Sequence, residues 1–346
     1  MSAWRAILRA IGTLLASGKF REDEVAEFLR LCAAACALIF SIAAGAAEAY
    51  PARPVRMIVP SGAGGITDIL GRLIAQRLTE SLGQQVVIDN RPGASGIVGS
   101  QIVATAAPDG YTLLMVFPSH PVNPSLFAKM PYDTLTAFAP ITLVSSVALV
   151  MLVGGDSPAN SVRELIALAR AKPGQLNYGS VGRGSLGHLG SELFRSMAGI
   201  AITHVAYKGS PQILSALIAG EIQIYMLASA GTAAPHVKAG RVKALGISTR
   251  DRLAVMPEVP PISDVLPGYE ARGWNGILAP AGTPKAVIDR LHAEIVKVVR
   301  SQEFGNHLLT EGATAVGNTP QEFAAVIRAD IQKWARVIKE AGIMRE

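Results

Sequence analysis

Short β-branched runs alternate with longer stretches of helical spacing along most of the chain. Apolar runs near residues 55–59, 85–89 and 111–117 predict strands, and amphipathic stretches near 68–82 and 96–106 predict the helices between them. The alternation returns with helices near 161–171, 185–197, 210–219 and 231–239 and strands at 175–180, 202–206, 221–227 and 242–247. Because strands that alternate with helices are typical of a parallel sheet covered on both faces, we expect an α/β protein.

The length of the chain indicates two domains, since the 346 − 49 = 297 residues after position 49 exceed the usual size of a single core. We interpret the apolar run at 141–153 as the segment that crosses into the second domain, and the chain crosses back near 274–278. Helices near 284–300, 302–311 and 319–341 are expected to complete the first domain. The expected boundaries are 1–49 for an N-terminal extension with a signal peptide, 50–153 and 277–346 for the first domain, and 154–276 for the second.

A glycine-rich bend follows the first strand and leads directly into a helix. Glycines let the backbone approach a ligand closely, and the free N–H groups of a helix N-terminus favour an anion. The alternative is that the glycines serve the turn alone and that Asp68 is a favourable acid in the first helical turn. The candidate ligand-binding residues here are Ser61, Gly62, Ala63, Gly64, Gly65, Thr67 and Asp68.

A second polar loop interrupts the chain after the strand at 111–117. Ligands of open α/β sheets bind outside the carboxyl ends of the strands, so this loop is expected to lie beside residues 61–67. It adds the candidates Ser119, His120 and Asn123. For His120, a structural hydrogen bond is the alternative to a contact with a ligand.

Residues 182–187 match the dinucleotide fingerprint Gly-x-Gly-x-x-Gly, after a predicted strand and before a predicted helix. The following strand, at 202–206, ends without the acid that would hold a ribose, so we do not expect a dinucleotide site. The same geometry serves a carboxylate equally well. Arg183 would then be its bidentate partner, the alternative being a solvated loop arginine, and His188 is either a donor or structural. The candidates in this domain are Ser180, Gly182, Arg183, Gly184, Ser185, His188 and Ser229.

The N-terminus carries a secretion signal in its sequence. Residues 31–47 form a charge-free, alanine-rich run that ends in Ala47-Glu48-Ala49, which predicts cleavage after Ala49; an uncleaved membrane anchor is the alternative. Both cysteines, Cys32 and Cys36, fall inside this signal, so the mature chain has no thiol chemistry. The segment before this run is too long and too acidic for the first part of an ordinary signal peptide. We therefore hypothesise that translation starts at Val25.

Several function classes lack support in the sequence. The net charge is +6, but lysines and arginines are scattered among acids with few aromatic residues, so nucleic-acid binding is not expected. The six histidines show no metal-ligand spacing, and no nucleophile elbow or phosphate-binding lysine loop is present, so we expect neither a metal, a cofactor nor a catalytic residue.

Several motifs resemble the Bug-type solute receptors, the periplasmic substrate-binding proteins of tripartite tricarboxylate transporters. The similarity covers residues 50–343 and is carried by residues 50–60, 64–68, 89–96, 107–114, 123–126, 207–209, 235–240 and 278–285. The resemblance implies a two-domain periplasmic-binding-protein-like fold of type II, with two crossing strands and a central ligand cleft that closes around its ligand. It also implies that backbone amides and ordered water hold a ligand carboxylate.

We therefore expect a monomeric periplasmic receptor for a small organic anion. Its partners would be the membrane permease subunits of a tripartite transporter, or a sensor kinase in the case of a receptor that serves signalling alone; an exported α/β enzyme is the remaining alternative. Arg183 departs from the small or amide residue frequent in the family. Residues 226–231 lack the acid that many relatives place there, which argues against a ligand with an amino group.

Overall fold

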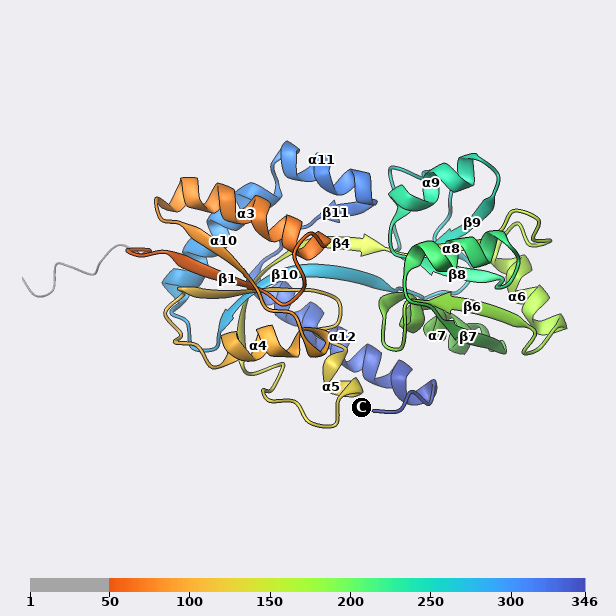
Figure 1. Cartoon of the computed structure of the whole chain (residues 1–346), viewed down its shortest axis with the longest axis horizontal. Coiled ribbons are helices and arrows are strands. Elements are labelled where there is room, and N and C mark those ends of the chain that lie inside the picture. Colours follow the sequence, from red (N-terminus) through yellow and green to blue (C-terminus); the bar gives the residue numbers. More distant parts are fainter. Residues whose placement is uncertain (1–49, 346) are drawn as a thin grey trace, which may run out of the picture. The chain divides into compact units, whose positions relative to one another are not determined.

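Two β-sheets organise the chain in the computed structural model, which describes residues 50–345 (Figure 1). From Arg53 onward the chain forms one compact unit. The predicted signal peptide, its cleavage site after Ala49, both cysteines and the hypothetical start at Val25 lie outside the described residues. The domain boundaries stay a prediction, and we call each sheet with its flanking helices a lobe.

The first sheet has six strands and the second has five within the described part of the chain. In spatial order the first contains β11 (Ala313–Ala315), β4 (Phe138–Ala148), β10 (Arg272–Pro280), β3 (Thr112–Val116), β1 (Val55–Val59) and β2 (Val86–Asn90). The second contains β7 (Ile202–Ala206), β6 (Leu176–Ser180), β8 (Ile224–Leu227), β5 (Val150–Gly154) and β9 (Val242–Ile247). The strands expected from the sequence pattern are confirmed, with ends that differ by a few residues.

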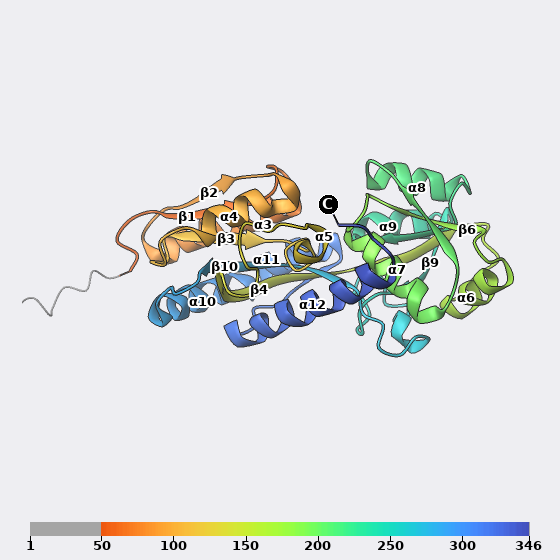
Figure 2. The ribbon, with the colours of Figure 1, turned by 90° about the horizontal axis from the view of Figure 1, so that it is seen from below.

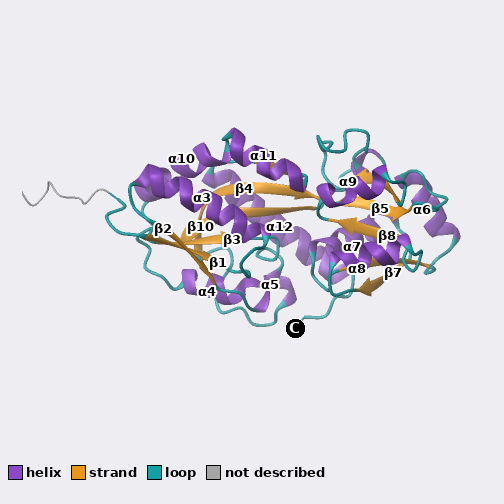
Figure 3. Cartoon of the chain, turned by 45° about the horizontal axis from the view of Figure 1, so that its top comes forward, coloured by secondary structure: helices purple, strands orange, loops and turns teal. Residues whose placement is uncertain are grey.

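Both sheets are mixed, which corrects the expectation of parallel sheets. The strand β1 pairs in parallel with β2 and β3, and β6 pairs in parallel with β7 and β8, as the alternating pattern predicts. However, β4, β10 and β11 pair antiparallel in the first sheet, and β5 pairs antiparallel with β8 and β9 in the second. The reason is that β4 leaves the first sheet and β10 returns to it, so the two run in opposite directions (Figure 3).

Ten helices of the described chain flank the sheets. They are α3 (Ile66–Leu82), α4 (Ile97–Ala104), α5 (Asn123–Leu126), α6 (Val162–Ala171), α7 (Leu186–Ala198), α8 (Ser210–Ile218), α9 (Ala230–Lys238), α10 (Lys285–Val299), α11 (Gln302–Glu311) and α12 (Pro320–Glu340). Only α5 had no counterpart in the sequence pattern, because a single helical turn is too short to show helical spacing. On one face of the first sheet, side chains of α4 and α12 share a core with β1, β3 and β10.

The last helix, α12, contributes to the cores of both lobes. It starts with a capping box between Thr319 and Glu322, as its sequence predicts, and its first half buries Phe323 against the first sheet. Its second half buries Trp334 and Val337 in a cluster that includes residues of α7 and β6 (Figure 2). The helix that was expected to complete the first domain thus packs against the second lobe as well.

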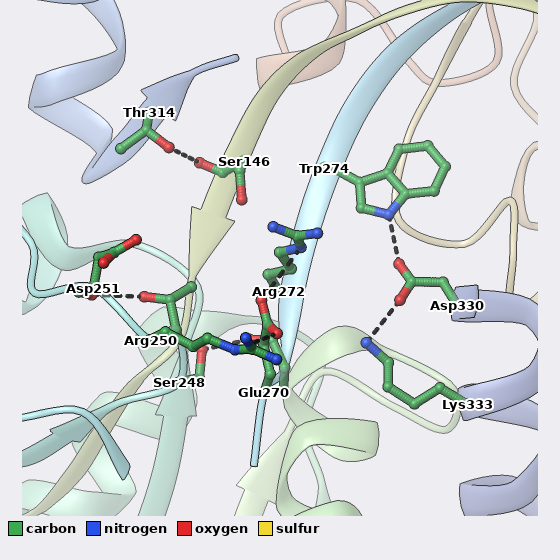
Figure 4. Close-up of polar contacts among 12 residues, drawn as sticks. Ser146, Ser248, Arg250, Asp251, Glu270, Arg272, Trp274, Thr314, Asp330 and Lys333 are labelled. Atoms are coloured by element: carbon green, nitrogen blue, oxygen red, sulfur yellow. Dashed lines mark hydrogen bonds and ion pairs between the residues drawn. The ribbon is translucent and has the colours of Figure 1, made fainter. Parts of the chain in front are cut away.

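The chain crosses between the lobes at two adjacent points. It passes from β4 to β5 at Leu149 and returns from β9 to β10 through residues 248–271. Below these crossings, Glu270 pairs with Arg250 at 3.4 Å and with Arg272 at 3.6 Å, while Asp330 accepts from the Trp274 indole and pairs with Lys333, both at 2.7 Å (Figure 4). Charged side chains thus lie on both sides of the crossing segments, with Asp330 and Lys333 on the side of α12 (Figure 4).

Candidate functional site

The helix α3 begins behind an exposed glycine loop without a side-chain cap. Its N-cap residue is Gly65, and no side-chain cap hydrogen bond is found at this helix start among residues 50–345. Gly64 adopts the left-handed region at φ +84°, which glycine tolerates best. Since the first N–H groups of a helix have no partner inside the helix, main-chain donors stand at the surface of this loop. The loop and the helix that follows it are found where the sequence pattern predicts them.

Asp68 fixes this loop from inside. Its carboxylate is almost completely buried and accepts hydrogen bonds from the Gly64 N–H at 2.9 Å, from Arg72 at 3.0 Å and from the Asn90 amide at 2.9 Å. The Asn90 amide donates in addition to the Ser61 carbonyl at 3.1 Å. Burial alone would raise the pKa of Asp68, but the three donors and the Arg72 charge hold it below its usual value. Asp68 is therefore an ionised structural anchor whose oxygens face the protein.

Thr67 also turns its side chain away from the loop surface. Its hydroxyl is buried and donates to the Asn275 Oδ1 atom at 3.0 Å. Ser61 Oγ is likewise buried, without a hydrogen-bond partner among the described residues. Of the seven candidates in this loop, it is thus the exposed main chain of residues 62–65 that can meet a ligand.

The loop after β3 is tied to a turn that the sequence analysis missed. The Ser119 hydroxyl and the Asn123 amide both donate to the carbonyl of Ser95, at 2.7 Å and 3.0 Å. Ser95 and Ala94 have positive φ angles of 52° and 44°, between the positive-φ glycines 93 and 96. The two glycines close together were the available signal for this strained turn.

His120 belongs to the core. It is 3% exposed and packs edge-to-face on Phe138 at a ring distance of 5.4 Å. Neither ring nitrogen has a hydrogen-bond partner among the described residues. Burial lowers the pKa of His120 to about 4, so the side chain is neutral at pH 7. A contact with a ligand and a structural hydrogen bond both stay predictions for His120.

In the second lobe the loop at 180–185 is held by its own hydroxyl groups. The Ser180 hydroxyl accepts from the Gly182 N–H at 3.1 Å and lies 2.7 Å from Nε2 of His204. Ser185 caps α7 by accepting from the His188 N–H and donates to the Gly182 carbonyl at 2.7 Å. These polar side chains therefore shape the loop, as glycines 182 and 184 do with φ angles of 121° and 70°.

His188 supports the same loop from below. Its Nδ1 accepts from the Gly184 N–H at 3.1 Å, so Nε2 carries the proton of the neutral ring. The ring stacks on His204 at 4.2 Å, and His204 stacks in turn on Tyr178. Burial, His204 and Arg183 together lower the pKa of His188 to about 4. His204, which the sequence analysis did not select, is thus part of the foundation of the loop.

Arg183 is exposed, and the contacts found among the described residues give it no ion pair. Its charge nevertheless acts on the stacked rings of His188 and His204. Together with burial, it lowers the pKa of both histidines. Ser229, in contrast, is a helix cap. Its hydroxyl accepts from the Thr232 N–H at 3.1 Å and donates to the Thr232 hydroxyl at 2.9 Å.

A cavity of about 230 Å³ brings the loops of the two lobes together. Ser119 from the first lobe lines it with Gly184 and Ser185 from the second, and its remaining walls include the rings of Trp274 and Trp334. The lobes touch beside it, since a side chain at Gly184 would overlap Leu126. Residues 61–67 do not line this cavity, so the common site expected for all the candidates stays a prediction.

Metal binding and membrane spanning are two further possibilities for residues 50–345. No group of three histidine, cysteine, aspartate or glutamate side chains in this range is placed to hold a metal ion. No helix in the same range combines the length and the apolar character needed to cross a membrane.

Comparisons with known proteins agree with this architecture. The family model described as the tripartite tricarboxylate transporter family receptor matches residues 70–343. The protein BugT of Bordetella pertussis is 36% identical over 303 residues, which cover 86% of this chain and 91% of BugT. An R. palustris protein solved with adipate is 36% identical, with a TM-score of 0.70, and the match covers 86% of this chain and all of that protein.

A more distant solved relative is MatC from Rhodopseudomonas palustris with bound malate. It is 29% identical with a TM-score of 0.67, and the match covers 84% of this chain and 100% of MatC. The family model spans most of the chain, and the family consists of solute-binding receptors and not of enzymes. The chain therefore belongs to the tripartite tricarboxylate transporter family receptors, whose two-lobed α/β fold it shares.

Proposed function

We propose that this receptor binds a small organic anion in the periplasm, with the ligand carboxylate at the glycine loop that opens α3. The observation that carries the proposal is the uncapped N-terminus of α3 behind Gly65, with Thr67 and Asp68 turned inward. Only main-chain N–H groups then face the ligand, and the helix dipole adds to their attraction for an anion. Relatives solved with adipate and malate support a carboxylate ligand.

The second lobe would complete the site with the loop at 180–185. Arg183 supplies an exposed positive charge there, suited to a second anionic group. The chain would be exported with cleavage after Ala49 and act as a monomer with domains at 50–153 plus 277–346 and at 154–276. Ligand binding would favour a closed arrangement of the two domains, which the permease subunits of a tripartite transporter would recognise.

A thermal-shift screen of residues 50–346 tests the ligand class. The panel contains acetate, malate, adipate, citrate, benzoate and glutamate. A ligand at a hundred times its dissociation constant stabilises the protein by about 2.7 kcal/mol and raises the midpoint by roughly 5 °C or more. A shift with none of these anions would refute the proposed ligand class.

The variant Ile66→Pro tests the role of the main chain. Proline is well tolerated at the first helical position, and Gly65 has the extended conformation (φ −77°, ψ 163°) that a following proline requires. The substitution removes one N–H group, so the affinity for the anion should fall at least about tenfold, as expected for a hydrogen bond to a charged group. The matched control is Lys285→Pro at the equally uncapped start of α10, which should leave the affinity unchanged.

Delivery to a permease is tested in cells. A strain that lacks this chain should lose uptake of the anion found in the screen, and the gene with its signal sequence should restore it. Normal uptake in the deletion strain would favour the signalling alternative.

A further inference from the structure

A buried chain of hydrogen bonds joins the start of α3 to both crossing strands. The Thr67 hydroxyl donates to Oδ1 of Asn275 on β10 at 3.0 Å, and the Asn275 amide nitrogen donates to the Ser145 hydroxyl on β4 at 3.2 Å. The three residues are 5%, 5% and 2% exposed, so water does not compete for these bonds. Thr67 and Asn275 lie 208 positions apart in the sequence, and the contact therefore depends on the tertiary fold.

The position of Asn275 on its strand is unusual. Asn275 lies opposite Ser145 in the antiparallel pair of β10 and β4, and the register of that pair shifts directly after it, between Asn275 and Gly276. Such an irregularity bends a strand and re-aims its side chains. The same two strands continue toward the second lobe, so a rotation of that lobe must be transmitted through them.

We propose that Asn275 is a positioning residue that couples the anion loop to the crossing strands. This inference rests on the proposed anion site at the start of α3. Asn275 fixes Thr67 in the first helical turn, and with it the N–H groups beside Thr67, relative to β4 and β10. Because its amide carries an acceptor oxygen and a donor NH2 group, it accepts from the loop and donates to the other strand at the same time. Occupation of the loop and the movement of the lobes would thereby depend on each other.

The substitution Thr67→Val tests this coupling. Valine keeps the shape of threonine and leaves every main-chain N–H in place, but it removes the donor to Asn275. We expect the affinity for the anion to fall roughly five- to tenfold, the size of one hydrogen-bond interaction. Thr67→Ser retains the hydroxyl and should bind within about twofold of the wild type. Affinities are measured by calorimetry with whichever anion of the thermal-shift panel binds the wild type most tightly.

The strand β4 offers a matched control. The Thr142 hydroxyl is fully buried and donates to the Asn318 carbonyl at 2.7 Å, outside the Thr67–Asn275–Ser145 chain. Thr142→Val makes the same chemical change and should lower the unfolding midpoint without lowering the affinity for the anion. If Thr67 has a structural role alone, Thr67→Val should also lower the unfolding midpoint without changing the anion affinity. That result would overturn the coupling.

Two further measurements separate the outcomes. Small-angle scattering should show a smaller ligand-dependent contraction for Thr67→Val than for the wild type at saturating anion. Ser145→Ala should weaken binding, and the double variant with Thr67→Val should be no weaker than either single variant, because both break one chain. If the wild type binds and Thr67→Val binds equally well, the coupling is refuted while the anion site stands. If the wild type binds none of the six anions of the thermal-shift panel, the proposed site is refuted, and this inference with it.

Discussion

The Ser248 hydroxyl accepts a hydrogen bond from the Leu149 main-chain N–H at 2.7 Å. The same hydroxyl donates to the carbonyl of Ala271, so one fully buried side chain holds both crossing segments together. The main chain of Ser248 pairs with the same two residues, at 2.9 Å and 3.0 Å. The two crossings therefore meet at one residue, and movement of the lobes has to pivot around it.

The variant Ser248→Ala should destabilise the protein by about 1–3 kcal/mol, because it leaves the buried Leu149 N–H without its acceptor. Urea unfolding measures this loss. Ser146→Ala, near the end of β4 and only half-buried, is the control and should stay within about 0.5 kcal/mol of the wild type. Equal stability of both variants would show that the Ser248 hydroxyl does not hold the crossings.

The variant Asp68→Ala should lower both stability and anion affinity, since Gly64, Arg72 and Asn90 lose their common acceptor. We expect a loss of roughly 1–3 kcal/mol at pH 7. The folded-state pKa of Asp68 is lowered, so its ionised form stabilises the fold above the ordinary value of 3.8, and this contribution disappears as the pH falls through the folded-state pKa. Urea unfolding at pH 7 and in acid should therefore show the difference from wild type shrink. Glu80→Ala, at the exposed end of the same helix, should change neither property.

Acid should destabilise the protein through His120. Its pKa is about 4 in the folded chain and 6.5 in the unfolded chain, so unfolding takes up a proton below pH 6.5. The stabilisation is complete above pH 6.5 and is lost as the pH falls toward 4, by roughly 3 kcal/mol in total. His188, with a pKa of about 4 as well, acts in the same direction.

The variant His120→Leu should make the unfolding free energy less dependent on pH between 6.5 and 4, as measured by urea titrations at several pH values. His236→Gln, which replaces a partly exposed histidine, should follow the wild type. An unchanged slope in His120→Leu would show that burial does not lower the pKa of His120 in the folded protein.

The variant Arg183→Ala should lower the affinity for a dianion about tenfold or more and the affinity for a monocarboxylate less than twofold. The reason is that only the dianion offers a second anionic group to the guanidinium. Arg163→Ala removes the same charge from the exposed surface of α6 and controls for the net charge. Calorimetry with adipate and hexanoate makes the comparison at equal chain length. Equal losses for both ligands would assign Arg183 to the solvated loop.

Hydrophobic spacing predicted most elements of the fold, but neither the short elements α5 and β11 nor the roles of the polar residues. The strand at 202–206 and the helix at 302–311 follow from periodicity alone. Ser185 and Ser229, in contrast, stand at helix starts, where a ligand and a helix cap need the same hydroxyl, and the structure shows that both are caps. Their orientation depends on neighbours that one sequence does not reveal.

Long-range contacts explain the remaining differences. Thr67 meets Asn275 and Ser119 meets Ser95 only after the lobes have formed, so no local pattern marks these pairs. His120 looks like a loop histidine in the sequence, yet packing against Phe138 takes it into the core. The glycine loop before α3 was predictable because its signal, a strand followed by glycines and a helix, is local.

The packing of α12 has a consequence for biogenesis. Phe323 and Trp334 complete the cores of different lobes from one helix that follows the strands of both sheets in the sequence. Neither core is finished until these residues have left the ribosome, so a nascent chain cannot reach its final packing early. A polypeptide that terminates before residue 320 would expose apolar surface in both lobes at once. Proteases and chaperones would bind such a chain as an unfolded protein.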